Sequence, residues 1–434
     1  MINEGLSVFK GKNVLLLQGP MGPFFRRLAR DLQWAGAQVC KVDFCGGDRL
    51  FSPAESISFR GRIEEWPEFF RQLLGERKID VVLLFGDCRP IHRLAHEVAH
   101  CSGVEIGVFE EGYVRPDYIT LERFGVNGFS LLPRSPIYYL QTPQPLIPEA
   151  RKVGSVFKYT ACWAILYYLA SAVLYPGFRH YRHHRSLSLL EALPWMRSLW
   201  RKVVYGAKEK KVLPKLKTSW TKKYYLVPLQ VHNDAQVRIH SAFDSVEDFV
   251  RQVMESFAQH APETTRLVIK HHPMDRGYYD YAGFINQHAR SLGIAGRVIY
   301  IHDQHLPTVL DHALGVVVAN STVGLSALDH GLPVKACKSA LYDMKGLTYQ
   351  GDLDNFWHAA LTESPNEELL TRFRTYLIQH TQLNGNFYKR LDIPGSSAGL
   401  VWGGNPAGDA TAVELNPGVG VPANRNIIKH KASR

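Results

Sequence analysis

Two parts of this chain alternate short apolar runs with helical segments, and this alternation restricts the possible folds more than any other feature. In the first part, the apolar runs are residues 14–17, 39–44, 81–85 and 105–109. In the second part, they are residues 224–229, 267–270, 298–301, 315–319 and 333–336. Strands that alternate with helices form βαβ units with a parallel sheet. The sequence therefore predicts an α/β protein with two doubly wound, Rossmann-like domains.

The length of 434 residues, 45% of them hydrophobic, is enough for two separate cores. We expect an N-terminal domain over 1–150, a linking segment over 151–223 and a C-terminal domain over 224–394. From residue 395 onward Gly, Ala, Pro and Asn dominate, which predicts a disordered tail over 395–434.

Two carboxylates and a glycine end the run at 105–109, namely Glu110, Glu111 and Gly112. Ligands of open α/β sheets bind outside the carboxyl ends of the strands, and a glycine there lets another backbone or a sugar approach closely. Because neighbouring carboxylates repel each other in a partly dry site, we expect one pKa to rise while the other group stays ionised. This arrangement suits acid/base or nucleophilic chemistry, although a solvated strand end would show the same residues.

Polar residues also follow two apolar runs of the second part. Lys270, His271, His272 and Pro273 end one run and place an imidazole at the sheet edge. The other run leads into the residues Asn320, Ser321 and Thr322. Ser321 is positioned to cap a helix whose free N–H groups favour an anion. Together these residues predict a phosphate pocket, although each group taken alone also fits an ordinary turn or helix cap.

The positive charge is concentrated in the linking segment. Residues 176–223 hold thirteen lysines and arginines against two glutamates, a balance that equals the formal charge of +11 of the whole chain. Just before them, residues 161–175 are uncharged and rich in aromatic side chains, but shorter than the ~20 residues of a spanning helix. We expect a membrane-surface anchor here, with Arg179, Arg182 and Arg185 facing anionic lipid. A core helix with a basic linker and a nucleic-acid patch are the alternatives.

The turn after the first apolar run contains Gly19 and Gly22 and is expected to admit an acceptor or a sugar. Its two prolines remove the backbone donors that a phosphate cradle needs. The six cysteines show neither disulfide nor metal-ligand spacing, and the N-terminus lacks the pattern of a secretion signal. We therefore expect a cytosolic protein without a metal site.

Five ordered motifs resemble the capsule polysaccharide biosynthesis and export family, specifically its KpsS (LipB) type, over residues 12–389. They are GPMGPFF at 19–25, FEEGYVRPDYITLE at 109–122, VPLQV at 227–231 followed by Asp234, KHHP at 270–273 and NSTVGL at 320–325. The resemblance implies a GT-B-like fold whose two domains face a cleft.

The resemblance also implies an activity, that of a retaining β-Kdo transferase. Such an enzyme transfers the first Kdo residue from CMP-β-Kdo to phosphatidylglycerol or lysophosphatidylglycerol, without a cofactor or an obligatory metal. It acts at the cytoplasmic face of the inner membrane, with other capsule assembly or export proteins as possible partners and without nucleic acid. By similarity, Glu111 is the catalytic carboxylate with Glu110 beside it, although related enzymes carry aspartate before the glycine. Retention of configuration then implies a covalent glycosyl-enzyme intermediate.

Further residues take their expected roles from the same motifs. Gln230 joins Lys270, His272, Pro273, Asn320, Ser321 and Thr322 in donor binding, and Arg115 and Asp117 join Gly19 and Gly22 in acceptor or sugar binding. Three other classes of protein remain open: a non-catalytic accessory protein of a capsule exporter, an inverting sialyltransferase-like enzyme and a nucleic-acid enzyme.

Overall fold

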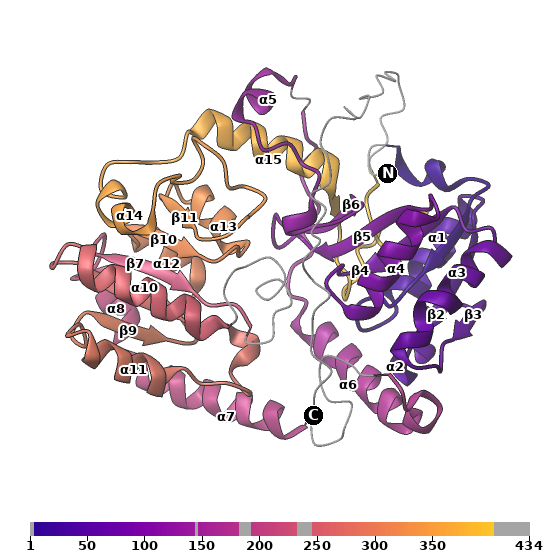
Figure 1. The fold of residues 1–434 in the computed structure, drawn as a ribbon, viewed down its shortest axis with the longest axis horizontal. Helices are drawn as coiled ribbons and strands as arrows, with labels where there is room; N and C mark the ends of the chain where they lie inside the picture. The colour runs from indigo at the N-terminus through magenta and orange to yellow at the C-terminus, as the bar shows by residue number, and fades with distance from the viewer. Residues whose placement is uncertain (1–3, 144–145, 182–191, 232–244, 403–434) are drawn as a thin grey trace.

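The computed structural model describes residues 4–143, 146–181, 192–231 and 245–402 of the chain. Two sheets form the centres of two α/β units (Figure 1). This arrangement confirms the predicted fold class. Among the described residues, no helix is both long and apolar enough to cross a membrane.

The first sheet has the strand order β12-β6-β5-β4-β1-β2-β3. Its strands are β1 (Asn13–Leu16), β2 (Gln38–Asp43), β3 (Ser56–Ser58), β4 (Val81–Phe85), β5 (Glu105–Glu111), β6 (Tyr118–Arg123) and β12 (Gln382–Asn384). β1 to β5 are parallel, whereas β6 runs antiparallel to both β5 and β12. The expected parallel sheet therefore has three further strands, β3, β6 and β12, which the sequence analysis did not predict.

Side chains of β1 alternate between two helical layers, because successive residues of a strand point to opposite faces. Val14 and Leu16 pack with the apolar face of α1 (Phe24–Trp34). Leu15 packs in the other layer with α3 (Trp66–Glu76) and α4 (Pro90–Cys101). Burial on both faces explains why this strand reads as a continuous apolar run.

The second sheet is fully parallel, with the strand order β11-β10-β7-β8-β9. Its strands are β7 (Tyr224–Pro228), β8 (Arg266–Lys270), β9 (Val298–Ile301), β10 (Gly315–Val318) and β11 (Val334–Ala336). The helices of this part are α10 (Val246–His260), α11 (Ala282–Ser291), α12 (Leu306–His312), α13 (Val323–Asp329), α14 (Leu353–Ala359) and α15 (Glu367–Thr381). Side-chain caps start two of them, since Ser245 accepts from the N–H of Asp248 and Asn366 accepts from that of Leu369.

The chain returns to the first sheet after α15, so the predicted end of the second domain at 394 is wrong. β12 pairs with β6, and Leu383 and Phe387 join the core of the first domain. Residues 395–402 also differ from the predicted disordered tail. There the buried carboxylate of Asp31 accepts hydrogen bonds from the hydroxyl of Ser396 and the backbone of Ala398, while residues 403–434 lie outside the described part.

The expected linking segment over 151–223 is divided between the two units. α6 (Phe157–Val173) packs on α2 (Gly46–Leu50) of the first unit, where the Tyr167 hydroxyl donates to Asp48 at 3.0 Å. α7 (Ala192–Lys208) lies along the second unit, where Arg201 donates to the carbonyl of Arg276. Figure 1 shows α6 and α7 along the same lower edge of the molecule. The remaining helices are α5 (Pro136–Gln141), which packs on α15, and α8 (Val212–Lys217), which packs on α12.

Candidate active site

Glu110 and Glu111 are the last two residues of β5, between β4 and β6. Their neighbours on the strand show which way they point. Val108 lies in the core layer of α3 and α4, whereas Phe109 lies in the layer of α1. Because side chains alternate along a strand, Glu110 shares the side of Val108 and Glu111 shares that of Phe109. The two carboxylates therefore face different surroundings.

Glu110 points toward the end of β4. A Cβ atom placed on Gly86 would lie 3.6 Å from Glu110 Oε2 and 4.0 Å from Arg89 Nε, so that both side chains border the same glycine. The N–H of Glu111 donates to Glu110 Oε1 at 2.9 Å. Burial raises the pKa of Glu110 to about 7; Glu111 and Asp87 add to the rise, while the bond from the Glu111 N–H and the charge of Arg89 oppose it. The predicted rise is therefore found, and burial is its main cause, ahead of repulsion between the two carboxylates.

Glu111 meets a residue that the sequence analysis missed. The hydroxyl of Tyr388 donates to Glu111 Oε1 at 3.3 Å, across 277 residues of sequence. Burial and the nearby Glu111 raise the pKa of Tyr388 well above its usual value, so this hydroxyl stays a donor. Trp163 of α6 donates to the carbonyl of Tyr388 and helps to hold this residue in place.

Packing within the chain explains why three positions near the expected acceptor site are glycines. A Cβ on Gly19 would lie 2.8 Å from the ring of Phe25, and one on Gly22 would lie 2.9 Å from the ring of Trp163. At Gly112 the obstacle is the backbone oxygen of Tyr118, 2.0 Å away, where the chain turns back into β6. The close approach of another backbone at Gly112 is thus found, whereas Gly19 and Gly22 make room for aromatic rings of the protein itself.

Arg115 and Asp117, the other two residues expected to bind acceptor or sugar, make bonds within the chain. Arg115 is exposed, and its Nε donates to the carbonyl of Gly112 at 3.2 Å. Asp117 accepts from the N–H of Val153 at 2.7 Å. The carboxylate of Asp117 therefore positions the start of the linking segment.

Gln18 and Arg89 connect the ends of β1 and β4, and neither was predicted as a site residue. Arg89 Nη1 donates to Gln18 Oε1 at 2.8 Å, and Gln18 Nε2 donates to Asp48 Oδ2 at 3.0 Å. β1 continues to β2 on one side, and the chain later returns to β4 on the other, so this bond spans the point where the strand order reverses. Ligands of doubly wound sheets bind at such a point. The sequence did offer signals for both residues: Gln18 is the first polar residue after β1, and Arg89 closely follows β4.

The second sheet reverses its strand order between β7 and β10. Gln230 follows β7, with the 270–273 motif after β8 on one side and the 320–322 motif after β10 on the other. The structure thus brings the three expected donor-binding segments to neighbouring strand ends.

Lys270 makes a bond within the chain, which was not expected. It is buried, and its ammonium donates to the carbonyl of His302 at 3.0 Å. Burial lowers its pKa. The adjacent His271 is also buried, and its Nδ1 shares a hydrogen bond with the hydroxyl of Tyr300. Both side chains therefore support the strand end from inside the domain.

His272 and Pro273 lie nearer the surface and begin the short turn η6 (Pro273–Asp275). The N–H of Met274 donates to His272 Nδ1 at 3.2 Å. A neutral imidazole with Nδ1 as acceptor carries its proton on Nε2, which can then donate to a ligand. The expected donor role of His272 therefore remains compatible with its geometry.

Asn320, Ser321 and Thr322 connect β10 to α13. Ser321 Oγ accepts from the N–H of Val323 at 3.2 Å, but the N-cap residue of α13 is Thr322, whose side chain makes no capping bond, so the expected cap by Ser321 is not found in this form. The Oδ1 atom of Asn320 is buried and has no protein partner. Burying such an atom without a partner is costly, so this position favours a ligand or water that donates a hydrogen bond.

Comparison with known proteins decides the family. The sequence model described as capsule polysaccharide biosynthesis protein matches residues 80–388. The chain belongs to the capsule polysaccharide biosynthesis family. The capsule polysaccharide export protein KpsS of Escherichia coli is 42% identical over 88% of this chain and 98% of its own length. The capsule polysaccharide modification protein LipB of Neisseria meningitidis serogroup A is 41% identical over 88% of this chain and 93% of its own length.

A solved structure, Thermosulfurimonas dismutans KpsC, a beta Kdo 2,7 transferase, shows a lower similarity. It is 15% identical, with a TM-score of 0.41, over 89% of this chain and 94% of that one. The family match includes Glu110, Glu111, His272, Ser321 and Tyr388, while Gln18 and the glycine turn after β1 precede it.

Among the described residues of this capsule-family protein, no three His, Cys, Asp or Glu side chains gather as a metal site requires. Of the three arginines expected at the membrane, Arg179 is exposed and its Nε donates to His180 at 3.3 Å. Arg182 and Arg185 lie outside the described residues, as does Asp234.

Proposed function

We propose that this protein is a retaining glycosyltransferase of capsule biosynthesis. It transfers the first β-Kdo residue from CMP-β-Kdo to phosphatidylglycerol or lysophosphatidylglycerol. Membership in the capsule family and the five ordered motifs support this function. The observation that carries it is the pair of carboxylates at the end of β5, where burial brings the pKa of Glu110 to about 7.

The two carboxylates take different roles in the proposed reaction. A Glu111 oxygen attacks the anomeric carbon of Kdo as the bond to the phosphate oxygen breaks, and CMP leaves with the electron pair. The acceptor hydroxyl then attacks the same carbon, and the bond to Glu111 breaks. Glu110 takes the hydroxyl proton, because a group with a pKa near 7 is suited to proton transfer at neutral pH. Two successive inversions give net retention.

The second domain binds the CMP part of the donor in this proposal. His272, Ser321 and Asn320 supply hydrogen-bonding groups at the carboxyl ends of β8 and β10. A donor placed at the leaving phosphate stabilises the negative charge that develops in the transition state. This role requires neither a metal nor a cofactor.

A lipid acceptor requires contact with a membrane, and two helices support it. α6 exposes Ile165, Leu166, Leu169 and Val173, and α7 exposes Met196, Leu199, Trp200 and Val203. We call these eight residues the apolar edge. Within each helix their spacing of three and four residues places them on one face. Exposed apolar faces of this kind mark interaction sites.

The charge of α6 and α7 favours an anionic lipid surface as the partner of the apolar edge. The two helices contain no aspartate or glutamate, and α7 exposes Arg197, Lys202 and Lys208. Each cation near an anionic leaflet contributes about 1 kcal/mol. We therefore place the protein at the cytoplasmic face of the inner membrane as a peripheral protein, alongside other capsule assembly or export proteins.

One experiment tests the proposed reaction. The protein is incubated with CMP-Kdo and a short-chain fluorescent phosphatidylglycerol, and the product is weighed by mass spectrometry. We expect the acceptor mass to increase by one Kdo residue, with release of CMP. An unchanged acceptor mass in the presence of intact donor and folded protein contradicts the proposal and favours the accessory role in export.

A further inference from the structure

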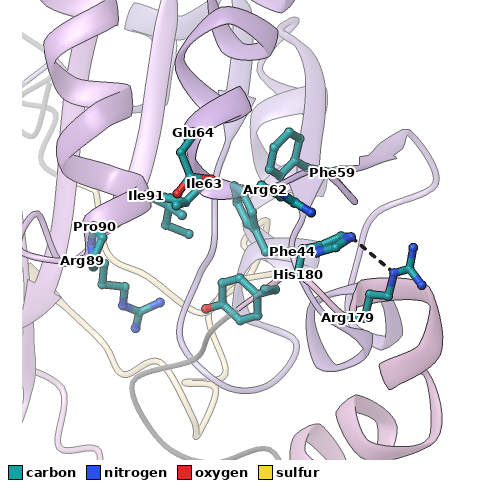
Figure 2. Close-up of a pocket in the computed structure, with 12 residues that line it drawn as sticks. Phe44, Phe59, Arg62, Ile63, Glu64, Arg89, Pro90, Ile91, Arg179 and His180 are labelled. Atoms are coloured by element: carbon teal, nitrogen blue, oxygen red, sulfur yellow. Dashed lines mark hydrogen bonds between the residues drawn. The ribbon is translucent and has the colours of Figure 1, made fainter. Parts of the chain in front are cut away.

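A pocket of about 650 Å³ lies in the first domain, on the side of the sheet toward which Glu110 points. Four separate segments form it (Figure 2). They are Phe44 after β2, residues 59–64 before α3, residues 89–91 at the start of α4, and residues 179–181 after α6. Its volume is in the range of ligand pockets, which is roughly 300–1,000 Å³.

The lining combines an apolar wall with positive charge. Phe44, Phe59 and Ile91 are buried side chains that form apolar surface. Arg62, Arg89 and Arg179 supply three cations, and Glu64 is the single carboxylate of the lining. Figure 2 shows Arg89 and Arg179 at different sides of the pocket. An elongated ligand with both an acyl chain and a phosphate matches this combination, because arginine binds phosphate oxygens through paired N–H donors.

Arg89 connects the pocket to the candidate active site. Its guanidinium donates to Gln18 at the reversal point of the sheet, and its charge acts on the pKa of Glu110. Arg89 and Glu110 also border the same glycine, Gly86. A ligand phosphate held at Arg89 therefore brings the adjoining glycerol hydroxyl close to the carboxylate that is proposed to take its proton.

The opposite side of the pocket leads toward the apolar edge. Arg179, His180 and Tyr181 follow η4 (Tyr175–Phe178), which directly follows the end of α6. Val173, Leu174 and Tyr175 are 67%, 42% and 50% exposed, so apolar surface continues from α6 to within four residues of Arg179. A lipid whose chain starts in a bilayer beneath α6 can reach the pocket along this surface.

We propose that this pocket binds the acceptor as a single-chain glycerophospholipid. The acyl chain lies against Phe44, Phe59 and Ile91, and the phosphodiester lies at Arg89. Arg62 and Arg179 add positive charge to other parts of the lining and favour entry of the anionic lipid. The terminal glycerol hydroxyl points to Glu110. This inference rests on the proposed transfer to a phosphatidylglycerol-type acceptor and specifies where that acceptor binds.

The test measures binding of lysophosphatidylglycerol, below its micelle concentration, by isothermal titration calorimetry on the full chain. Monoacylglycerol with the same chain lacks the phosphate, and glycerol phosphate lacks the chain. We therefore expect the affinity of each to be at least about tenfold lower than that of lysophosphatidylglycerol. CMP should not compete with lysophosphatidylglycerol. Competition by CMP would overturn the proposal and assign the aromatic, arginine-lined pocket to the donor nucleotide.

Two variants examine the pocket itself. Arg62→Glu reverses a charge at the exposed rim, and Ile91→Trp fills the apolar wall. We expect each to weaken lysophosphatidylglycerol binding by about tenfold or more, with unchanged affinity for CMP. The matched control is Arg93→Glu, an exposed charge reversal on α4 outside the pocket. If Ile91→Trp unfolds the protein, Arg62→Glu still tests the pocket, because the Arg62 side chain is exposed and its replacement should leave the fold intact.

The outcomes separate this inference from the proposed reaction. If the variants weaken lipid binding but the protein transfers no Kdo, the pocket assignment stands and the proposed transferase activity is contradicted. If the protein transfers Kdo but neither variant affects lipid binding, the proposed transferase activity stands and the pocket assignment is overturned.

Discussion

The two sheets reverse their strand order in the same way but place different chemistry at the reversal point. In the first sheet the ends of β1, β4 and β5 carry Gln18, Arg89 and Glu110, and the carboxyl has a pKa of about 7. In the second sheet the carboxylates near the strand ends are engaged: Glu209 accepts from His302, and Asp303 pairs with Arg276. The first domain is therefore suited to proton transfer, and the second is suited to binding an anion through neutral donors.

Removing the carboxylate of Glu111 should have the largest effect. If Glu111 is the nucleophile, Glu111→Gln lowers the transfer rate by about three orders of magnitude or more. Wild-type protein mixed with CMP-Kdo and no acceptor should give a Kdo adduct on the peptide that contains Glu111, detected by mass spectrometry. Tyr388→Phe is the matched control, because it keeps the carboxylate and removes only one hydrogen bond, at a cost of about tenfold. A fully active Glu111→Gln variant would contradict the assignment of Glu111 as the nucleophile.

Glu110→Gln should separate the proton-transfer step from the rest of the reaction. As a base Glu110 must be ionised, so kcat/KM of the wild type should rise as the pH increases through about 7. The variant should be about 10²- to 10⁴-fold slower and should lose this rise. A variant that keeps the wild-type pH profile would assign the titration to another group.

His272→Ala examines the second sheet in the same assay. Loss of a donor to the leaving phosphate costs about 2–4 kcal/mol in the transition state. The rate should fall accordingly, while circular dichroism shows an unchanged fold. His260→Ala, at the exposed end of α10, controls for loss of an imidazole from the same domain. If the His272→Ala variant keeps the wild-type turnover rate, His272 does not act on the leaving phosphate.

Single changes in the apolar edge compare α6 with α7. Leu169→Glu and Leu199→Glu each remove about 1.5–3 kcal/mol of apolar burial in the bilayer and add repulsion from anionic lipid. We expect weaker binding to anionic vesicles in flotation, and weaker wild-type binding at higher salt. Leu361→Glu, an exposed leucine outside both helices, should bind as the wild type does. Equal flotation of all three variants would exclude the apolar edge as the docking surface.

The smallest expected effect is on stability. The folded state holds the Glu110 proton up to about pH 7, whereas the unfolded carboxyl loses it near pH 4.5. Glu110 alone should therefore lower the free energy of unfolding by about 2 kcal/mol as the pH rises from 5 to 8. Denaturant titration of Glu110→Gln should show a smaller decrease, while Glu97→Gln, an exposed change on α4, should follow the wild type. Identical slopes for all three proteins would contradict the raised pKa of Glu110.

Much of the fold was predictable because strands buried on both faces read as apolar runs. The strands that carry Glu110 and Lys270, and the strand that precedes Asn320, were predicted near their observed positions. β6 and β12 were missed because their polar residues, such as Thr120 and Gln382, resemble a loop. In the structure Gln382 Nε2 donates to Thr120 Oγ1 at 2.9 Å, so the partner of each polar group comes from the other strand.

The sequence by itself determined that two α/β units occur and that carboxylates, imidazoles and hydroxyls follow their strands. Local periodicity carries this information, because each strand and its end are encoded within a few residues. Only the tertiary structure decided that Glu110 and Glu111 face opposite layers, that Tyr388 meets Glu111 and that Lys270 is buried on a carbonyl. Only it brought residues 44, 59–64, 89–91 and 179–181 around one pocket. These arrangements depend on packing between segments far apart in the chain, and no local pattern specifies such packing.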